Sequence, residues 1–244
     1  MRRGLALGAL LLGAWWGVSA LGLVPDFMLP SPAEVALAGW RNSAYLAQNA
    51  VVTGSEILLG LLGGTLLGAA AAVVIAASRA LQRWLMPLLV VSQAVPVFAL
   101  APLMVLWLGF GLASKVALAV LVIFFPVTAN FLDGLRRTEP GWLDLAATMG
   151  AKPWRVLLRV RLPAALPALA SGVRVAAAVA PIGAVLGEWV GASSGLGYVM
   201  LNANARIETA LMFAALVLLA LMSVALYVAV DRGLRAALRW SPGG

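Results

Sequence analysis

Three ionisable residues lie within or beside long apolar stretches of this sequence: Glu56, Arg174 and Glu188. A charge at bilayer depth costs at least about 2.5–3.5 kcal/mol, so such residues usually mark a translocation pathway or a structural ion pair. Arg174 and Glu188 are separated by close to four helical turns, which places both on one helix face about 21 Å apart. Each therefore needs water, another helix or a second subunit as its partner. A structural clamp and a pathway role both remain open for Arg174, whereas Glu56 is expected at the outer end of a helix, within reach of water.

Residues suited to enzymatic chemistry are scarce. The chain has no cysteine and no histidine, which excludes disulfides, thiolate chemistry and histidine-based acid catalysis. Its nine acidic residues are scattered, without the adjacent pair that acid/base catalysis uses. The sequence also lacks the Gly-x-x-x-x-Gly-Lys-Ser/Thr loop that binds ATP phosphates. We therefore expect no catalytic, cofactor or metal site, and any uphill transport must be driven by an ion gradient or by a separate ATPase.

The elements that position these side chains are predicted to be transmembrane helices. Hydrophobic residues make up 63% of the 244 residues and charged residues 11%, against about 45–50% and about 25% in soluble proteins, and the mean hydropathy is +1.01. A spanning helix needs roughly 20 apolar residues. Uncharged runs of that order cover 4–24, 57–78, 84–114, 116–132 and 209–230, and a sixth, 165–186, is interrupted only by Arg174. The fold class is therefore all-α integral membrane with six transmembrane helices, because the runs do not alternate as barrel strands do.

The distribution of positive charge predicts the orientation. With a cytoplasmic N-terminus, three basic residues face outward: Arg41, Lys115 and Arg206. Thirteen then face inward: Arg2, Arg3, Arg79, Arg83, Arg136, Arg137, Lys152, Arg155, Arg159, Arg161, Arg232, Arg235 and Arg239. This bias predicts that both termini are cytoplasmic, and it makes anionic lipid headgroups, rather than nucleic acid, the expected neighbours of the net charge of +8. The N-terminal run is longer than a signal-peptide core of about 7–15 residues, which favours an uncleaved first helix over a cleavable signal peptide.

Glycine, proline and capping residues indicate how individual helices start, pack and bend. Ser31 is expected to cap a short helix, with Pro32 at its first position and Glu34 three residues after the cap. The second run has glycines at spacings of three and four residues, which leave a flat face for another helix: Gly60, Gly63, Gly64 and Gly68.

The third and fourth runs are candidates for lining a passage. They contain prolines and polar residues: Gln93, Pro96, Pro102, Pro126, Thr128 and Asn130. Prolines at membrane depth free backbone carbonyls, which is tolerated only against protein or a water-filled cavity. A passage and a pair of kinked packing helices both remain open. The candidate pathway residues are Gln93, Pro96, Asn130, Arg174 and Glu188.

Between two apolar runs, residues 144–163 form a charged segment that changes direction. A short helical stretch is expected up to Met149, followed by a sharp turn at Gly150 and a second helix over 152–161 that starts near Pro153. In the second helix, the spacing of Lys152, Arg155 and Arg159 predicts one basic stripe. An amphipathic helix on the inner leaflet and a docking elbow for a cytoplasmic protein are the two interpretations.

The same segment resembles the EAA loop, the cytoplasmic signature of the permease subunits of bacterial ABC importers. The family pattern is Glu-Ala-Ala, three residues, Gly, nine residues, Ile, one residue, Leu-Pro. At the same spacing this chain has Asp144-Leu145-Ala146, Gly150, Val160 and Leu162-Pro163. The departures, at Asp144, Leu145 and Val160, are conservative in charge or apolarity. The spacing from Gly150 to Leu162-Pro163 is the specific part of the match.

Outside the loop, the resemblance is to the nitrate/sulfonate/taurine branch of these permeases. The similar segments are 29–35, Val95-Pro96 with Ala101-Pro102, 107–111 with Lys115, and Glu188 with 195–198. Segments 187–192 and 201–206 look most like permeases for thiamine-pyrimidine precursors. Because the binding protein does most of the selection in such systems, nitrate, sulfonate and taurine-type solutes stay open.

The resemblance implies a type I ABC importer (MetI-like) permease fold in the bacterial inner membrane, and a set of partners. These are a second permease subunit in an expected homodimer, two cytoplasmic ATPase subunits that hold ATP and Mg²⁺, and an extracytoplasmic solute-binding protein. The residues implied in ATPase coupling are Asp144, Ala146, Ala147, Gly150, Lys152, Arg155, Leu162 and Pro163. We expect residues 1–50 to form the first helix and an outer segment, and residues 51–244 to form a five-helix core with the coupling loop at 134–163.

Two other functions remain as alternatives. A gradient-driven secondary transporter or channel would use the basic loop only as a lipid anchor, but such carriers often have inverted repeats and membrane-embedded Asp, Glu or His. This chain has no histidine and no evident repeat. A scaffold protein without transport activity would not explain the spacing from Gly150 to Leu162-Pro163.

Overall fold

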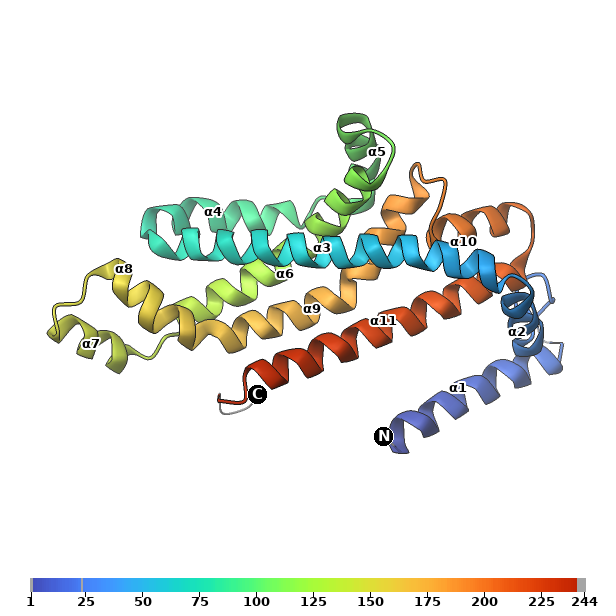
Figure 1. Ribbon diagram of the computed structural model, residues 1–244, viewed down its shortest axis with the longest axis horizontal. Coiled ribbons are helices and arrows are strands. Elements are labelled where there is room, and N and C mark those ends of the chain that lie inside the picture. Colours follow the sequence, from blue (N-terminus) through green and yellow to red (C-terminus); the bar gives the residue numbers. More distant parts are fainter. Residues whose placement is uncertain (1, 23, 241–244) are drawn as a thin grey trace.

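A computed structural model describes the backbone of residues 2–22 and 24–240, and each regular element in those ranges is a helix (Figure 1). In chain order the elements are α1 (Arg2–Ala20), α2 (Pro32–Arg41), α3 (Ser43–Ala77), α4 (Arg79–Ser92), α5 (Val97–Leu108), α6 (Leu112–Arg136), α7 (Pro140–Thr148), α8 (Pro153–Val156), the π-helix η1 (Leu157–Arg161), α9 (Leu162–Trp189), α10 (Leu196–Ala205) and α11 (Thr209–Ala237). The prediction of an all-α protein is confirmed for this part of the chain.

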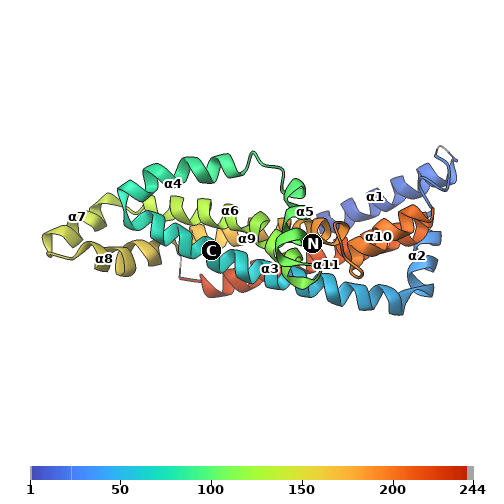
Figure 2. The ribbon, with the colours of Figure 1, turned by 90° about the horizontal axis from the view of Figure 1, so that it is seen from above.

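The long helices α3, α6, α9 and α11 run along an elongated bundle (Figures 1 and 2). At one end α7 and α8 project beyond the other helices; we call these two helices and the turn between them, residues 140–156, the elbow, and this end of the bundle the elbow end. Helices α2 and α10 lie at the opposite end. Within the described residues, four stretches are long and apolar enough to cross a membrane: α3, α6, Pro153–Trp189 and α11.

The third predicted run, 84–114, is not one continuous helix. It forms α4 and α5, which are bent by 99° at the break between them. Helix α4 ends at Ser92, and Pro96 is the N-cap residue of α5, with an extended ψ of 117°. Proline lacks an N–H and disfavours helical geometry in the residue before it, so α4 cannot continue through Pro96 into α5. Counted as one broken span, the pair raises the number of possible spans to five. Three side chains expected to face inward lie outside the described residues: Arg2, Arg3 and Arg79.

The glycines of α3 put this helix directly against α6. A Cβ at Gly64 would lie 2.5 Å from Ile123 Cγ2, and one at Gly68 would lie 2.9 Å from the Phe124 carbonyl oxygen. A Cβ at Gly60 would overlap the side chain of α6 that faces it. The predicted flat face is confirmed, and it lets two backbones approach as closely as dispersion-driven packing in lipid requires.

Helix α9 packs at the centre of the bundle through small side chains. Ala176, Ala180 and Ala184 are fully buried, and a Cβ at Gly183 would lie 2.7 Å from the Ala119 Cα on α6. Because these side chains are small, the backbone of α9 approaches the neighbouring helices closely, and many van der Waals contacts hold it there.

The outer segment before α3 has the predicted helix start. Ser31 N donates to the Glu34 carboxylate (2.8 Å), and Glu34 N donates to Ser31 Oγ (3.3 Å). This reciprocal pair is a capping box, and Pro32 follows it at the first helical position. The predicted cap of α2 is therefore confirmed.

Candidate functional site

The chain changes direction within the elbow at a single glycine, Gly150. After α7 ends at Thr148, Gly150 N donates to the Ala147 carbonyl (2.9 Å) and Ala151 N donates to the Ala146 carbonyl (3.0 Å). These two bonds form a Schellman motif, whose residue after the C-cap adopts the left-handed conformation. Gly150 does so with φ +66°. The predicted change of direction is confirmed. It is caused by the left-handed residue that ends α7, a backbone conformation in which a residue with a Cβ would be strained.

Beyond the turn, the chain enters one long helical stretch. Helix α8 passes into η1, whose last hydrogen bond runs from Leu162 N to the Leu157 carbonyl. Pro163 has no N–H for the usual α-helical bond to the residue four positions before it, and the wider π turn accommodates that gap. The predicted helix that starts near Pro153 is confirmed, but it does not end at Arg161, since it continues into α9 without a break.

Most of the residues implied in ATPase coupling lie on the surface of the elbow. Asp144, Ala147, Gly150, Lys152 and Arg155 are exposed, Leu162 and Pro163 are half-buried, and Ala146 is buried. Large apolar side chains are exposed among them: Trp142, Leu145, Met149 and Trp154. The Arg155 guanidinium lies 5.3 Å from the centre of the Trp154 ring, within cation–π distance. Exposed aromatic, methionine and arginine side chains together are typical of protein-contact surfaces.

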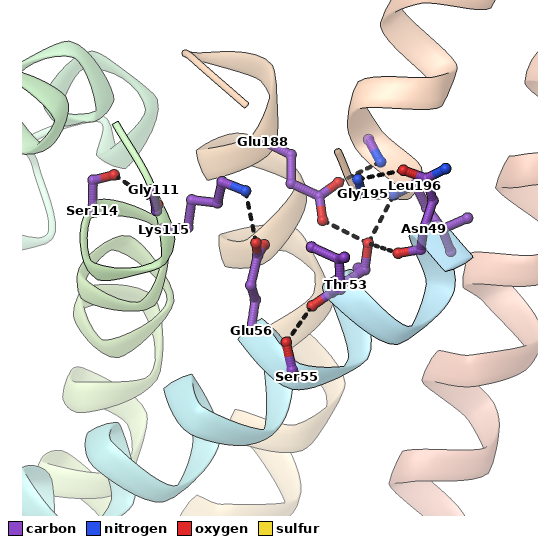
Figure 3. A network of polar contacts seen from close by, with 12 residues as sticks. Asn49, Thr53, Ser55, Glu56, Gly111, Ser114, Lys115, Glu188, Gly195 and Leu196 are labelled. Atoms are coloured by element: carbon purple, nitrogen blue, oxygen red, sulfur yellow. Dashed lines mark hydrogen bonds and ion pairs between the residues drawn. The ribbon is translucent and has the colours of Figure 1, made fainter. Parts of the chain in front are cut away.

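At the opposite end of the bundle, Glu188 joins α9 to α3 and α10 (Figure 3). The side chain is 1% exposed, and its carboxylate accepts a hydrogen bond from Thr53 Oγ1 (2.5 Å). Three N–H donors at the start of α10 are held by side chains: Gly195 N by Asn49 Oδ1 (2.7 Å), Leu196 N by Thr53 Oγ1 (2.8 Å) and Gly197 N by Glu188 (2.5 Å). The negative charge therefore sits at the positive end of a helix dipole, where it is favoured.

Two glycines make room for this carboxylate. Gly195 has φ +112°, and a Cβ there would overlap the carboxyl group of Glu188. A Cβ at Gly197 would lie 2.8 Å from Glu188 Oε2. The combination of Glu188 with 195–198 is thus a packing unit in which a buried carboxylate reaches a helix N-terminus.

Glu56 and Lys115 form a buried ion pair beside Glu188, between α3 and α6 (Figure 3). Lys115 Nζ lies 2.9 Å from Glu56 Oε1, and the side chains are 8% and 0% exposed. The expectation that Glu56 reaches water is wrong, because α3 starts at Ser43 and places this residue inside the helix. Lys115, expected among the outward-facing charges, is buried as well. Glu56 Oε2 has no hydrogen-bond partner among the described residues.

The polar residues of α3 that complete this network were not singled out from the sequence. Asn49 and Thr53 precede the apolar run that begins at residue 57, so the hydropathy pattern did not place them in a spanning helix. Their spacing with Glu56, i, i+4 and i+7, is the signal that would have found them, because it places all three on one helix face.

Arg174 has its partner on α11. Its Nε lies 2.8 Å from Asp231 Oδ1, and Asp231 Oδ2 lies 2.9 Å from Arg235 Nε. The partner helix that the sequence left open is therefore α11, and the contact is with a carboxylate rather than with backbone or lipid headgroups.

The remaining pathway candidates lie apart. Gln93 is exposed at the end of α4, in a groove of about 700 Å³ between α3, α4, α5 and α6. Pro96 is exposed at the start of α5, and half-buried Asn130 donates to the Pro126 carbonyl within α6 (2.7 Å). Among the described residues these three share no hydrogen bond with one another, nor with Arg174 or Glu188. No group of three or more acidic side chains in the described part of the chain could hold a metal ion.

Comparison with known proteins gives one family match and several close relatives. The family described as "Binding-protein-dependent transport system inner membrane component" matches residues 64–239. A Haemophilus influenzae protein named "Probable ABC transporter permease protein" is 53% identical, over 93% of this chain and 92% of its own length. The riboflavin transport system permease protein RibX of Chloroflexus aurantiacus is 40% identical, over 97% and 90%. The formylaminopyrimidine transport permease protein ThiX of Halalkalibacterium halodurans is 35% identical, over 95% and 93%.

More distant matches extend this set. Permeases named for aliphatic sulfonates in Bacillus subtilis and for taurine in Escherichia coli are each 32% identical to this chain. Among solved structures, an inward-facing conformation of the MetNI methionine ABC transporter matches with a TM-score of 0.71 at 21% identity, over 80% of this chain and 97% of that one. At that identity the likeness concerns the fold alone.

Proposed function

This chain belongs to the family of binding-protein-dependent transport system inner membrane components, and from that premise we propose that it forms the translocation pathway of an ABC importer for a small polar solute. The resemblance to ABC importer permeases inferred from 144–163 is confirmed by the family match and by relatives named for formylaminopyrimidine, sulfonate and taurine transport. The similarity in fold to a MetNI chain agrees with a MetI-like permease.

The elbow is the proposed contact with a separate ATPase. The observation that carries this proposal is its geometry: a turn locked by Gly150 holds Met149, 77% exposed, among further exposed apolar side chains beyond the end of the bundle. An apolar surface exposed to water favours burial against another protein. The ATPase subunits would supply the work through ATP and Mg²⁺, which this chain has no loop to bind.

One continuous helical stretch connects the elbow to the opposite end of the bundle, so a movement of the elbow would be transmitted along it. The stretch Pro153–Trp189 contains 37 helical residues, which span about 55 Å at 1.5 Å per residue. It begins in the elbow and ends at Glu188 in the buried network of the opposite end. Closure of an ATPase dimer would draw two elbows together, and rigid-body movement of α9 would then turn the cavity from inward-facing to outward-facing.

The proposed arrangement places the elbow end in the cytoplasm of a bacterial cell, with the protein in the inner membrane. This arrangement takes the four long spans and the bent pair α4–α5 as five crossings, and it adds α1 as the sixth crossing expected from the sequence. Both termini are then cytoplasmic. A second copy of the chain completes the pathway as a homodimer, and a solute-binding protein delivers the solute at the end formed by α2 and α10.

For the substrate we propose a nitrogen heterocycle of the thiamine-pyrimidine type. The relatives named for formylaminopyrimidine and riboflavin are 35% and 40% identical to this chain, whereas those named for sulfonates and taurine are each 32% identical. Mass spectrometry of the small molecule that copurifies with the cognate binding protein tests this choice. A sulfonate, taurine or nitrate found there would contradict it.

Copurification tests the proposed partnership. The chain, coexpressed with its cognate ABC ATPase and solubilised in mild detergent, is expected to retain that subunit on an affinity column. Met149→Asp places a charge in the apolar elbow surface and should release the ATPase. Met28→Asp is the matched control, because Met28 is 59% exposed in the loop before α2, at the opposite end.

Two results would favour a gradient-driven carrier instead. One is a native chain that retains no ATPase, and the other is solute uptake that collapses with an ionophore while ATP is held constant. Retention of the ATPase by Met149→Asp at the level of Met28→Asp would contradict the elbow as its docking surface.

A further inference from the structure

Arg161, the last residue of η1, contacts the ends of two other helices. Its Nε donates to the Leu135 carbonyl of α6 at 2.9 Å, and its Nη1 lies 3.5 Å from the Ala76 carbonyl of α3. The side chain is half-buried. One guanidinium therefore connects the exit of the elbow with α3 and with α6.

Both carbonyls are groups that a helix leaves without an internal partner. Leu135 and Ala76 lie in the last turns of α6 and α3, where the final four carbonyls have no N–H donor within the helix. The negative end of each helix dipole also favours a cation there. Arginine suits this position because its planar fork of five N–H donors can serve two acceptors at once, which a lysine ammonium on a single flexible stem does poorly.

The π turn places Arg161 on the inner face of the stretch. Leu157, at the other end of η1, is buried in a cluster with Ile75 of α3 and Leu132 of α6. Leu157 and Arg161 thus face the same two helices, one through apolar contact and one through hydrogen bonds. Arg155 and Arg159, which the spacing placed in the basic stripe, are exposed.

We infer that Arg161 is a positioning residue that transmits movement of the elbow to α3 and α6. The inference rests on the proposed function, since it concerns how work done on the elbow reaches the membrane helices. Helix α9 follows the elbow because it is covalently continuous with it. The other two helices meet this region through apolar contacts, which resist sliding weakly, and through the hydrogen bonds of Arg161, which fix position and direction.

Hydrogen–deuterium exchange of the complex in nanodiscs measures this transmission without a transported solute. The wild-type chain with its ATPase is compared without nucleotide and with ATP plus vanadate. We expect ATP-dependent changes of exchange in the elbow, 140–156, and at the ends of α3 and α6, 70–77 and 130–136. In Arg161→Gln the change in the elbow should remain, and the changes in α3 and α6 should be lost.

Arg159→Gln is the matched control, because it removes the same charge from an exposed position two residues away. It should keep all the changes at wild-type size. Arg161→Lys keeps the charge but not the fork, so it should keep the elbow response and show reduced responses in α3 and α6. If Arg161→Gln fails to fold, Arg161→Lys tests the inference in its place. Undiminished responses of α3 and α6 in Arg161→Lys then overturn the inference.

The outcomes separate the inference from the function on which it rests. Full responses in Arg161→Gln overturn the inference while leaving the proposed function intact. If Arg161→Gln loses the response of the elbow together with those of α3 and α6, Arg161 acts in ATPase docking, and the inference that it transmits movement is overturned. A wild-type chain that copurifies with no ATPase contradicts the proposed function itself, and the inference with it.

Discussion

Glu188 and Glu56 are both buried carboxylates, yet different partners stabilise them. Glu188 lies at the N-terminal end of α10 and accepts a backbone N–H, so fixed dipoles offset the cost of its burial. Glu56 depends on the ammonium of Lys115, on another helix. A buried carboxylate that loses its counter-charge is far more costly than a neutral pair of the same shape. The two sites therefore predict different responses to substitution.

Lys115→Met should lower the free energy of unfolding by about 3–5 kcal/mol, because it leaves Glu56 buried without a counter-charge. The double variant with Glu56→Gln should recover much of that loss. Thermal unfolding in detergent, followed by tryptophan fluorescence, measures both. Arg206→Met, at an exposed cation of the same end of the bundle, should change stability by no more than about 0.5 kcal/mol. A double variant as unstable as Lys115→Met would show that the ion pair is not the cause.

At the scale of elements, the elbow and the α3–α6 contact depend on glycine for different reasons. Gly150 has open space around it but a positive φ, so its conformation is what requires glycine. Gly64 has helical backbone but no space, because Ile123 of α6 occupies the position of a Cβ. The first glycine fixes a direction of the chain, and the second fixes a distance between helices.

Gly150→Ala should disfavour the native turn by about 1–2 kcal/mol, the cost of placing an L-residue in the left-handed region. The population of the formed elbow should then fall about 5–30-fold relative to open forms. The fraction of ATPase retained in copurification, together with the exchange rates of the amides of Gly150 and Ala151, measures this loss. Gly141→Ala is the matched control, since Gly141 lies in the same elbow with ordinary φ and open space. Equal retention by the two variants would mean that docking does not need this turn.

At the scale of the whole molecule, burial and apolarity vary in opposite directions among the spans. Helix α11 is the most apolar of the four long spans and the least buried. Pro153–Trp189 is the least apolar, and half of the residues in its apolar part are buried. Lipid covers the exposed surface of a membrane protein, so the most hydrophobic side chains face outward. The protein core instead uses small residues and satisfied polar groups. This pattern places α9 inside the bundle and α11 at its surface.

The orientation of the bundle can be tested with single cysteines, because the native chain has none. Asn204→Cys at the end of α10 should react with a membrane-impermeant maleimide in intact spheroplasts. Ala237→Cys at the end of α11 should react only after permeabilisation. The unmodified chain is the background control. Labelling with the reverse pattern would place the elbow outside the cell and contradict its contact with a cytoplasmic ATPase.

Several features followed from the sequence because they depend on neighbouring residues. The apolar runs predicted the long helices, the glycine spacing predicted a close helix contact, and the residues around Gly150 predicted a sharp turn, since hydropathy, periodicity and turn chemistry are local properties. The spacing from Gly150 to Leu162-Pro163 was enough to indicate the family. The prolines of 84–114 left a kinked helix open, but they did not predict a complete break into two helices, because the run is uncharged throughout and hydropathy does not register a change of direction.

The polar contacts inside the bundle were decided by the tertiary structure alone. Glu56 meets Lys115 across 59 positions of the chain, Thr53 meets Glu188 across 135, and Arg161 reaches back 85 positions to Ala76. A local pattern cannot state which helices pack together, and at single positions it favoured a solvated helix end for Glu56. Burial is a property of the whole packed molecule, and in lipid a buried charge persists only where distant parts of the chain bring it a partner.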